Sequence, residues 1–121
     1  MGEDRIHYIS HKGQAVLLVD LSCTAGAEFE RICNLVPEFV TREPRESVLI
    51  LGDFTGVKFD RAAVDTLKRA AVFDRPYIKR AAWVGIDTLP KVYYENIKTF
   101  TRRDLPAFNT REEALEWLVG E

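Results

Sequence analysis

The residues with the clearest potential for chemistry lie in LGDFTGVKFDR, residues 51–61, which follows an apolar run. Asp53 and Asp60 bracket this segment, and two carboxylates can share acid and base roles where burial raises the pKa of one of them. Both residues also have structural interpretations, because Asp53 can accept hydrogen bonds from loop amides and Asp60 can cap a helix. We favour the structural roles.

The glycines of this segment superficially resemble a phosphate-binding loop. A Walker A sequence needs four residues between its glycines, followed directly by lysine and a hydroxyl residue. Here three residues separate Gly52 from Gly56, Val57 precedes Lys58, and Phe59 takes the hydroxyl position. The dinucleotide, serine-hydrolase and zinc-protease motifs are also absent from the sequence. The sequence therefore predicts neither an enzyme nor a cofactor.

The histidines and cysteines offer little support for a metal site. His7 and His11, the only two histidines, could share one face of a strand. A metal would need a third ligand, which Asp20 or Cys23 supplies only by assumption, so we predict no metal site. Cys23 and Cys33 form no CxxC motif, and we expect both to be free thiols.

The elements that would position the loop follow from hydrophobic periodicity and turn residues. A hairpin is expected first, and helices then alternate with strands in the order ββαβαβαβα. This pattern predicts one α/β domain over residues 1–121, with about four helices packed on a mixed sheet of four to five strands. The expected strands cover 6–9, 14–20, 47–51, part of 77–86 and 107–108, and the helices follow residues 24, 60, 88 and 110.

Three positions carry specific predictions about helix geometry. Thr24 can cap the first helix. Pro37 lies inside that helix and predicts a kink or break near Cys33, since proline removes one backbone hydrogen bond. Thr110 and Glu113 form a capping box in which each side chain can accept from the other's backbone N–H.

Charge is uneven along a chain whose net charge is only -2. Residues 68–103 carry nine basic and three acidic side chains, and several aromatic residues lie among them. Most of these aromatics lie at positions that we expect to face the core, so we expect no nucleic-acid binding. The sequence does not decide whether the basic residues share one surface. Apolar runs are too short to span a bilayer and the start has no secretory signal, which favours a cytoplasmic protein.

The order of elements, together with VLILGDFTGVKFDRAAVDTLKRA, resembles the STAS domains, and most of all their stand-alone bacterial SpoIIAA-like set. Further features are His11-Lys12-Gly13, the strand end at Asp20, and residues 108–118. In signalling members an aspartate at the start of the second helix is followed by two serines, one of which a kinase phosphorylates. Asp60 matches that aspartate. Arg61, Ala62 and Ala63 follow it, so the resemblance implies a module without the usual phosphoacceptor.

These considerations predict a non-enzymatic, regulatory or protein-interaction module. Its predicted binding surface comprises Asp53, Thr55, Lys58, Asp60 and Arg61. Arg61 beside exposed helix amides would favour an acidic group on the partner. Because descriptions of the family also mention Sec14-like carriers, the alternative is a binder of a small apolar or amphipathic ligand such as a lipid. The sequence does not decide whether the protein forms a homodimer.

Overall fold

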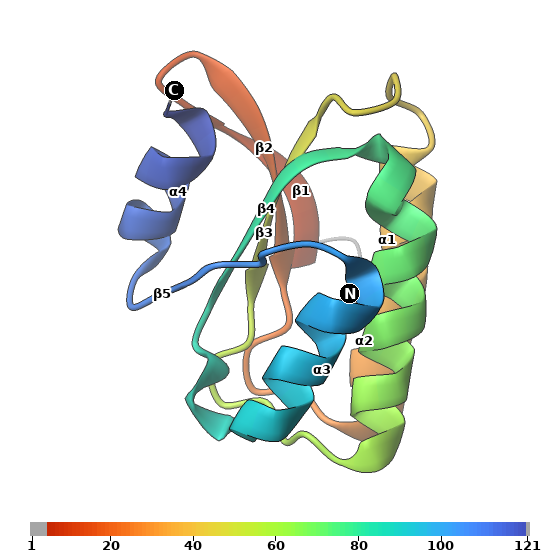
Figure 1. The fold of residues 1–121 in the computed structure, drawn as a ribbon. Helices are drawn as coiled ribbons and strands as arrows, with labels where there is room; N and C mark the ends of the chain where they lie inside the picture. The colour runs from red at the N-terminus through yellow and green to blue at the C-terminus, as the bar shows by residue number, and fades with distance from the viewer. Residues whose placement is uncertain (1–4, 121) are drawn as a thin grey trace.

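The computed structural model describes residues 5–120, which form one sheet and two layers of helices (Figure 1). Short 3-10 helices cover Arg75–Tyr77 and Ile86–Thr88. No helix within the described range combines the length and apolarity needed to cross a membrane. The strands are β1 (Ile6–His11), β2 (Gln14–Asp20), β3 (Val48–Asp53), β4 (Ile78–Val84) and β5 (Ala107–Phe108); the helices are α1 (Gly26–Val40), α2 (Arg61–Asp74), α3 (Lys91–Thr101) and α4 (Arg111–Val119).

The strands lie in the sheet in chain order, from β1 to β5. β1 pairs antiparallel with β2, and every other neighbouring pair is parallel. Right-handed crossovers that advance in one direction place their helices on the same face of the sheet. Accordingly α1, α2 and α3 cover one face, whereas α4 returns to the other (Figure 1). The predicted α/β class, mixed sheet and element order are confirmed.

The sheet divides the hydrophobic core into two clusters. The larger lies against α1, α2 and α3 and includes Phe29 and Ile97, both fully buried. The smaller lies under α4 and includes Leu118. Strand β3 contributes to both, because Val48 belongs to the first cluster and Leu49 to the second. This two-sided burial explains why β3 is apolar without alternation.

Helix α1 continues through its proline, so of the kink or break expected near Cys33 the break is wrong. Pro37 lies in the last turn, where the missing N–H removes a single intrahelical bond. Val36 and Val40 on either side of it are buried against the core. Their burial holds the last turn in helical geometry despite the lost hydrogen bond.

Two of the predicted helix caps differ in detail. The Thr24 hydroxyl donates to a carbonyl of the preceding loop at 2.7 Å, and α1 begins without a side-chain cap. In α4 the Thr110 hydroxyl accepts from the Glu113 amide at 3.1 Å, as predicted. The Glu113 carboxylate accepts from the Asn109 amide at 3.2 Å instead of from Thr110. The capping box is therefore only half formed.

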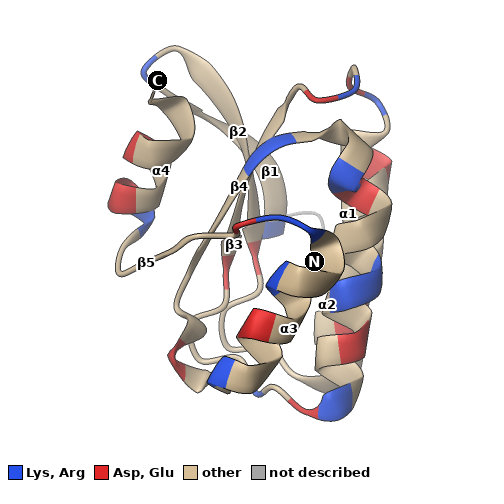
Figure 2. Ribbon diagram, in the orientation of Figure 1, with Lys and Arg blue, Asp and Glu red and all other residues tan. Residues whose placement is uncertain are grey.

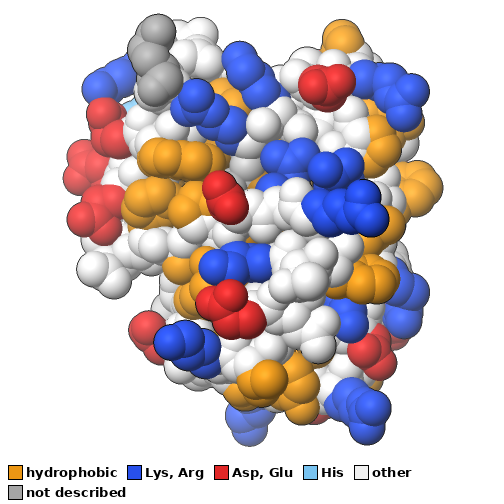
Figure 3. Space-filling model, viewed as in Figure 1, with side chains coloured by type: hydrophobic (Ala, Val, Ile, Leu, Met, Phe, Trp, Pro, Cys, Tyr) orange, Lys and Arg blue, Asp and Glu red, His pale blue; other side chains and the backbone are white. Residues whose placement is uncertain are grey.

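The basic residues of the middle third are not evenly scattered. Five of the nine line one groove, over the start of β4 and the segment after α3. Figure 3 shows Lys and Arg side chains gathered on this face. The five are Arg75, Lys79, Arg80, Arg102 and Arg103.

Candidate functional site at the carboxyl edge of the sheet

Two neighbouring parallel strands end in the same short motif. Asp20 of β2 pairs in register with Asp53 of β3 (Figure 2). Asp53 Oδ1 accepts from the Thr55 amide at 3.0 Å and from its hydroxyl at 2.7 Å. Asp20 Oδ1 accepts in the same way from the Ser22 amide at 3.0 Å and hydroxyl at 2.5 Å. Each aspartate thereby fixes the loop that leaves its strand.

Arginines from both ends of the chain join this pair of aspartates. Arg111, the first residue of α4, donates from Nε to Asp53 Oδ2 at 2.7 Å. Its guanidinium also lies 3.5 Å from Asp20 Oδ1. Arg5 donates to the Ser22 carbonyl at 2.8 Å and to the Asp20 carbonyl at 3.3 Å. Arg5 also lies 4.0 Å from Asp20 Oδ1, so each guanidinium offsets part of the charge of the two carboxylates.

The pKa of Asp53 does not suit a catalytic acid or base. Asp53 is only 6% exposed, and burial acts to raise its pKa. The hydrogen bonds from Thr55, and the hydrogen bond and charge of Arg111, outweigh burial and hold the pKa below its usual value. Asp53 is therefore ionised at neutral pH and accepts three hydrogen bonds, which suits a structural carboxylate rather than a proton carrier.

The structure brings the remaining predicted site residues together on one exposed turn. Asp60 caps α2 as predicted, since its Oδ1 accepts from the Ala63 amide at 2.8 Å. Asp53 is buried beneath the turn and so cannot belong to its contact surface, which corrects that part of the predicted binding surface. The exposed members are Thr55, Lys58, Asp60 and Arg61.

Backbone contacts hold this turn in one conformation. The Cys23 amide donates to the Thr55 carbonyl at 2.8 Å, and the Thr88 hydroxyl donates to the Val57 carbonyl at 2.7 Å. Gly85, at the end of β4, packs so closely that a Cβ there would collide with Thr55. Its φ of 70° is also in the left-handed region that favours glycine. The exposed side chains therefore project from a rigid support.

His11 belongs to a charged cluster with Lys12 and Glu116. His11 Nε2 lies 2.7 Å from Glu116 Oε2, and the Lys12 ammonium lies 2.6 Å from the other oxygen of that carboxylate. These contacts attach the β1–β2 hairpin to α4. No group of three or more potential metal-ligating side chains occurs among residues 5–120.

The comparisons with known proteins add no relative. No family model, curated protein or solved structure matches the chain. Function is therefore inferred from the geometry of this site and from the resemblance in sequence.

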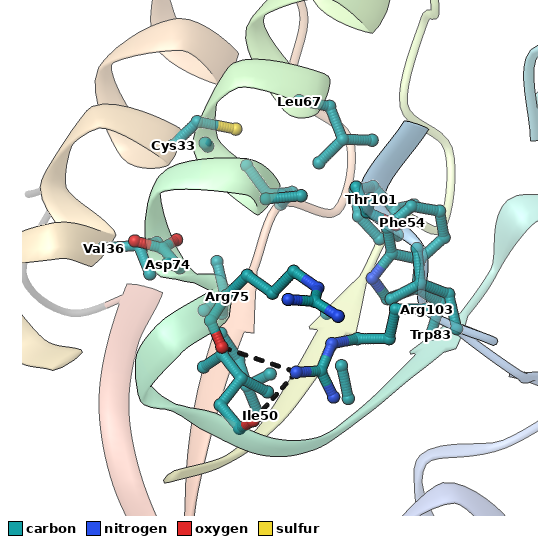
Figure 4. Close-up of a pocket in the computed structure, with 18 residues that line it drawn as sticks. Cys33, Val36, Ile50, Phe54, Leu67, Asp74, Arg75, Trp83, Thr101 and Arg103 are labelled. Atoms are coloured by element: carbon teal, nitrogen blue, oxygen red, sulfur yellow. Dashed lines mark hydrogen bonds between the residues drawn. The ribbon is translucent and has the colours of Figure 1, made fainter. Parts of the chain in front are cut away.

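A cavity lies between the sheet and the layer formed by α1 and α2, and Arg75 and Arg103 of the basic groove also line it. Its volume is about 80 Å³, and its walls are mainly apolar. Asp74, the last residue of α2, lines it, is 6% exposed, and has an Oδ1 atom with no hydrogen-bond partner. Figure 4 shows its carboxylate turned toward Val36, away from the Arg75 guanidinium. Burial raises the pKa of Asp74 to about 7.

Sequence reasoning missed the members of the site that lie far from the loop. Arg111 and Arg5 are separated from Asp53 by dozens of residues, and only the three-dimensional fold brings them together. One signal was available: Asp20-Leu21-Ser22 and Asp53-Phe54-Thr55 repeat the same pattern of aspartate and hydroxyl at two strand ends.

Proposed function

We propose that this chain is a non-enzymatic, STAS-like module of the cytoplasm that binds a protein partner through the exposed turn at the end of β3. The observation that supports this proposal best is the rigid presentation of Thr55, Lys58, Asp60 and Arg61 above a carboxylate pair whose charge is already offset. A rigid polar surface loses little conformational freedom on binding. The three hydrogen bonds that hold Asp53 oppose a catalytic role.

The start of α2 supports a module that binds without a phosphorylation switch. Ala62 is exposed in the first turn of α2, where signalling STAS domains carry a serine by the sequence resemblance. Its methyl group cannot accept a phosphate. Arg61 stands beside it in the first turn of a helix that Asp60 caps, and together with Lys58 it gives the surface two cations that favour an acidic partner.

Reversing the charge of this surface should abolish partner binding. We expect Lys58→Glu combined with Arg61→Glu to lose at least tenfold in affinity for proteins captured by the wild type, because two attractive charges become repulsive. Affinity capture from the native host, followed by titration of the captured protein, measures the effect. Lys79→Glu with Arg102→Glu is the matched control, since it makes the same charge change on the basic groove.

The outcome is decided by the comparison between the two double variants. Retained binding in a folded Lys58→Glu, Arg61→Glu protein would contradict this surface, as would equal loss in both variants. Circular dichroism establishes that each variant keeps the fold.

The cavity beside Asp74 favours a second candidate, a carrier of a small ligand. Mainly apolar walls, the unpaired carboxylate oxygen of Asp74 and the nearby guanidiniums of Arg75 and Arg103 suit a ligand with an apolar body and one polar end. At about 80 Å³ the cavity is smaller than ligand sites of about 300 to 1,000 Å³. A lipid would therefore require α1 and α2 to move apart.

Native mass spectrometry tests the carrier directly. A carrier should leave purification with a bound small molecule, and Asp74→Leu should remove that molecule by filling the cavity and deleting the acceptor oxygen. Bare wild-type protein that also fails to take up short-chain alcohols or amines would exclude the carrier. If Asp74→Leu retains the ligand as well as the wild type does, the ligand binds outside this cavity.

A further inference from the structure

A basic groove lies at the opposite end of the sheet from the proposed partner surface. Its volume is about 330 Å³, and its walls come from the end of α2, the start of β4, the segment after α3, and α4. In Figure 2 basic segments of the first three converge. Within residues 5–120, Asp104 is the only acidic residue in the lining. Five cations against one carboxylate make this a strongly positive concave surface, and its lining includes Arg75, Lys79, Arg80, Arg102, Arg103 and Trp117.

An irregularity in β4 directs Lys79 into the groove. The register between β3 and β4 pairs Val48 with Ile78 but Leu49 with Arg80, so Lys79 has no partner on β3. Such a bulge turns a side chain away from the direction that alternation would give it. Ile78 stays in the core while Lys79 is exposed. The bulge therefore adds a cation to the groove while the strand pairing continues on both sides of it.

Two of the groove's arginines are held in place by backbone carbonyls. Arg80 donates to the carbonyls of Trp117 and Gly120 at 3.0 and 2.6 Å, and its guanidinium lies 5.5 Å from the Trp117 ring centroid. Arg103 donates to the Ile78 carbonyl at 2.9 Å. Carbonyl partners orient a guanidinium but leave its full charge, so both cations are positioned before any anion arrives.

The other cations have no carboxylate partner. No ion pair involves any of the groove's lysine or arginine side chains among residues 5–120. Figure 4 shows the Arg75 and Arg103 guanidiniums close together. Burial and the neighbouring charge of Arg75 both lower the pKa of Arg103, which is the effect of like charges held together. An anion between them would relieve that repulsion.

Arg102 stands in a backbone conformation that usually requires glycine. It terminates α3 with a φ of 56°, in the left-handed region. Side chains other than glycine and asparagine are disfavoured at such helix ends. The chain thus places a cation in a strained position on the rim of the groove, a pattern associated with functional sites.

From these observations we propose that the groove binds a small phosphate-bearing anion, of the class of compact phosphate and diphosphate esters. Guanidinium forks match phosphoryl oxygens in geometry, and several charges suit an anion with at least two negative charges. The volume is that of a small-molecule site. A concave groove walled by Trp117 favours such a ligand over the phosphate backbone of a nucleic acid. This inference is independent of the partner surface at the other end of the sheet.

Fluorescence and calorimetry can test the site with pyrophosphate and adenosine diphosphate as probes. Trp117 is 38% exposed and lines the groove, whereas Trp83, the only other tryptophan, is 6% exposed. We expect saturable binding in the micromolar range, with a change in tryptophan emission that Trp117→Phe removes. Lys79→Glu with Arg102→Glu should weaken binding at least tenfold, and the matched Lys58→Glu, Arg61→Glu variant should stay within twofold of wild type.

The variant Arg102→Gly distinguishes an effect on ligand affinity from an effect on stability. Glycine relieves the left-handed backbone, so the melting temperature should be unchanged or higher while affinity for pyrophosphate falls severalfold. Absence of saturation by either probe would overturn the proposal, and so would equal weakening in both double variants. Tighter binding of a twelve-nucleotide DNA, lost with the Lys79 and Arg102 substitutions, would overturn it in favour of a nucleic-acid surface.

Discussion

Replacing Asp74 with asparagine is expected to make the protein more stable at pH 8 and to leave it nearly unchanged near pH 4. Burial raises the pKa of Asp74 to about 7 in the folded state. The folded protein therefore holds a proton that the unfolded chain releases near pH 4. Between pH 5 and pH 8 this carboxyl alone should lower the free energy of unfolding by roughly 2 to 3 kcal/mol.

The direction follows from which state binds the proton more tightly. Because the folded pKa is the higher one, stability declines as pH rises from about 4 to 7 and is level above that range. Asparagine cannot ionise, so the variant should lack this decline. It should be more stable by about 1 to 3 kcal/mol at pH 8, less than the full ionisation cost because the buried amide also needs partners.

Urea unfolding at pH 5 and pH 8 measures this effect. Asp65→Asn is the matched control, because Asp65 lies on the same helix but is exposed. The control should follow the wild-type pH dependence. Identical pH profiles for Asp74→Asn and wild type would show that Asp74 is ionised and satisfied in solution, and would remove the carboxylate from the argument for a small-ligand carrier.

The buried carboxyl of Asp74 lowers stability, and this cost suggests that the residue serves a function. Nothing in the fold requires a carboxylate at this position, since Asp74 caps nothing and forms no ion pair among residues 5–120. The residue thus breaks a rule that the rest of the core obeys. Departures of this kind concentrate where a protein binds something, which is why the cavity supports the second candidate.

The fold was predictable because its local signals agree with one another. The unbroken apolar run of β3 marks a strand covered on both faces, and Asp60 before an amphipathic segment marks the start of α2. Errors arose where tertiary contacts prevail over local preference. Packing of Val36 and Val40 keeps α1 helical through Pro37, and the Thr24 hydroxyl binds a loop carbonyl instead of capping.

The site was only partly predictable, because its members come from distant segments. The loop from residue 53 to residue 61 is contiguous, so its position at the edge of the sheet followed from element order alone. The contact between Arg111 and Asp53 spans 58 positions and leaves no periodic signal. One cation of the basic groove, Lys79, lies at a bulge, which a simple alternation of inward and outward residues does not anticipate.

Removing the Arg111 side chain is expected to destabilise the fold through the carboxylate it leaves behind. Arg111→Ala should lower the free energy of unfolding by about 2 kcal/mol, since Asp53 would stay buried and ionised with its Oδ2 unpaired. The value is below that of a fully buried pair because the Arg111 side chain is 42% exposed. Arg61→Ala, on an exposed arginine, should change stability by less than about 0.5 kcal/mol.

A double-mutant cycle with Asp53→Asn separates the ion pair from the packing of Arg111. If the charge on Asp53 is what makes the loss of Arg111 costly, Arg111→Ala should cost at least about 1 kcal/mol less in the Asp53→Asn background. Equal costs in both backgrounds would mean that Arg111 stabilises α4 through its aliphatic stem alone. The pH profile gives a second reading: because the pKa of Asp53 is lowered in the folded state, its contribution to stability disappears as pH falls below about 4, and Arg111→Ala should weaken that acid-induced loss.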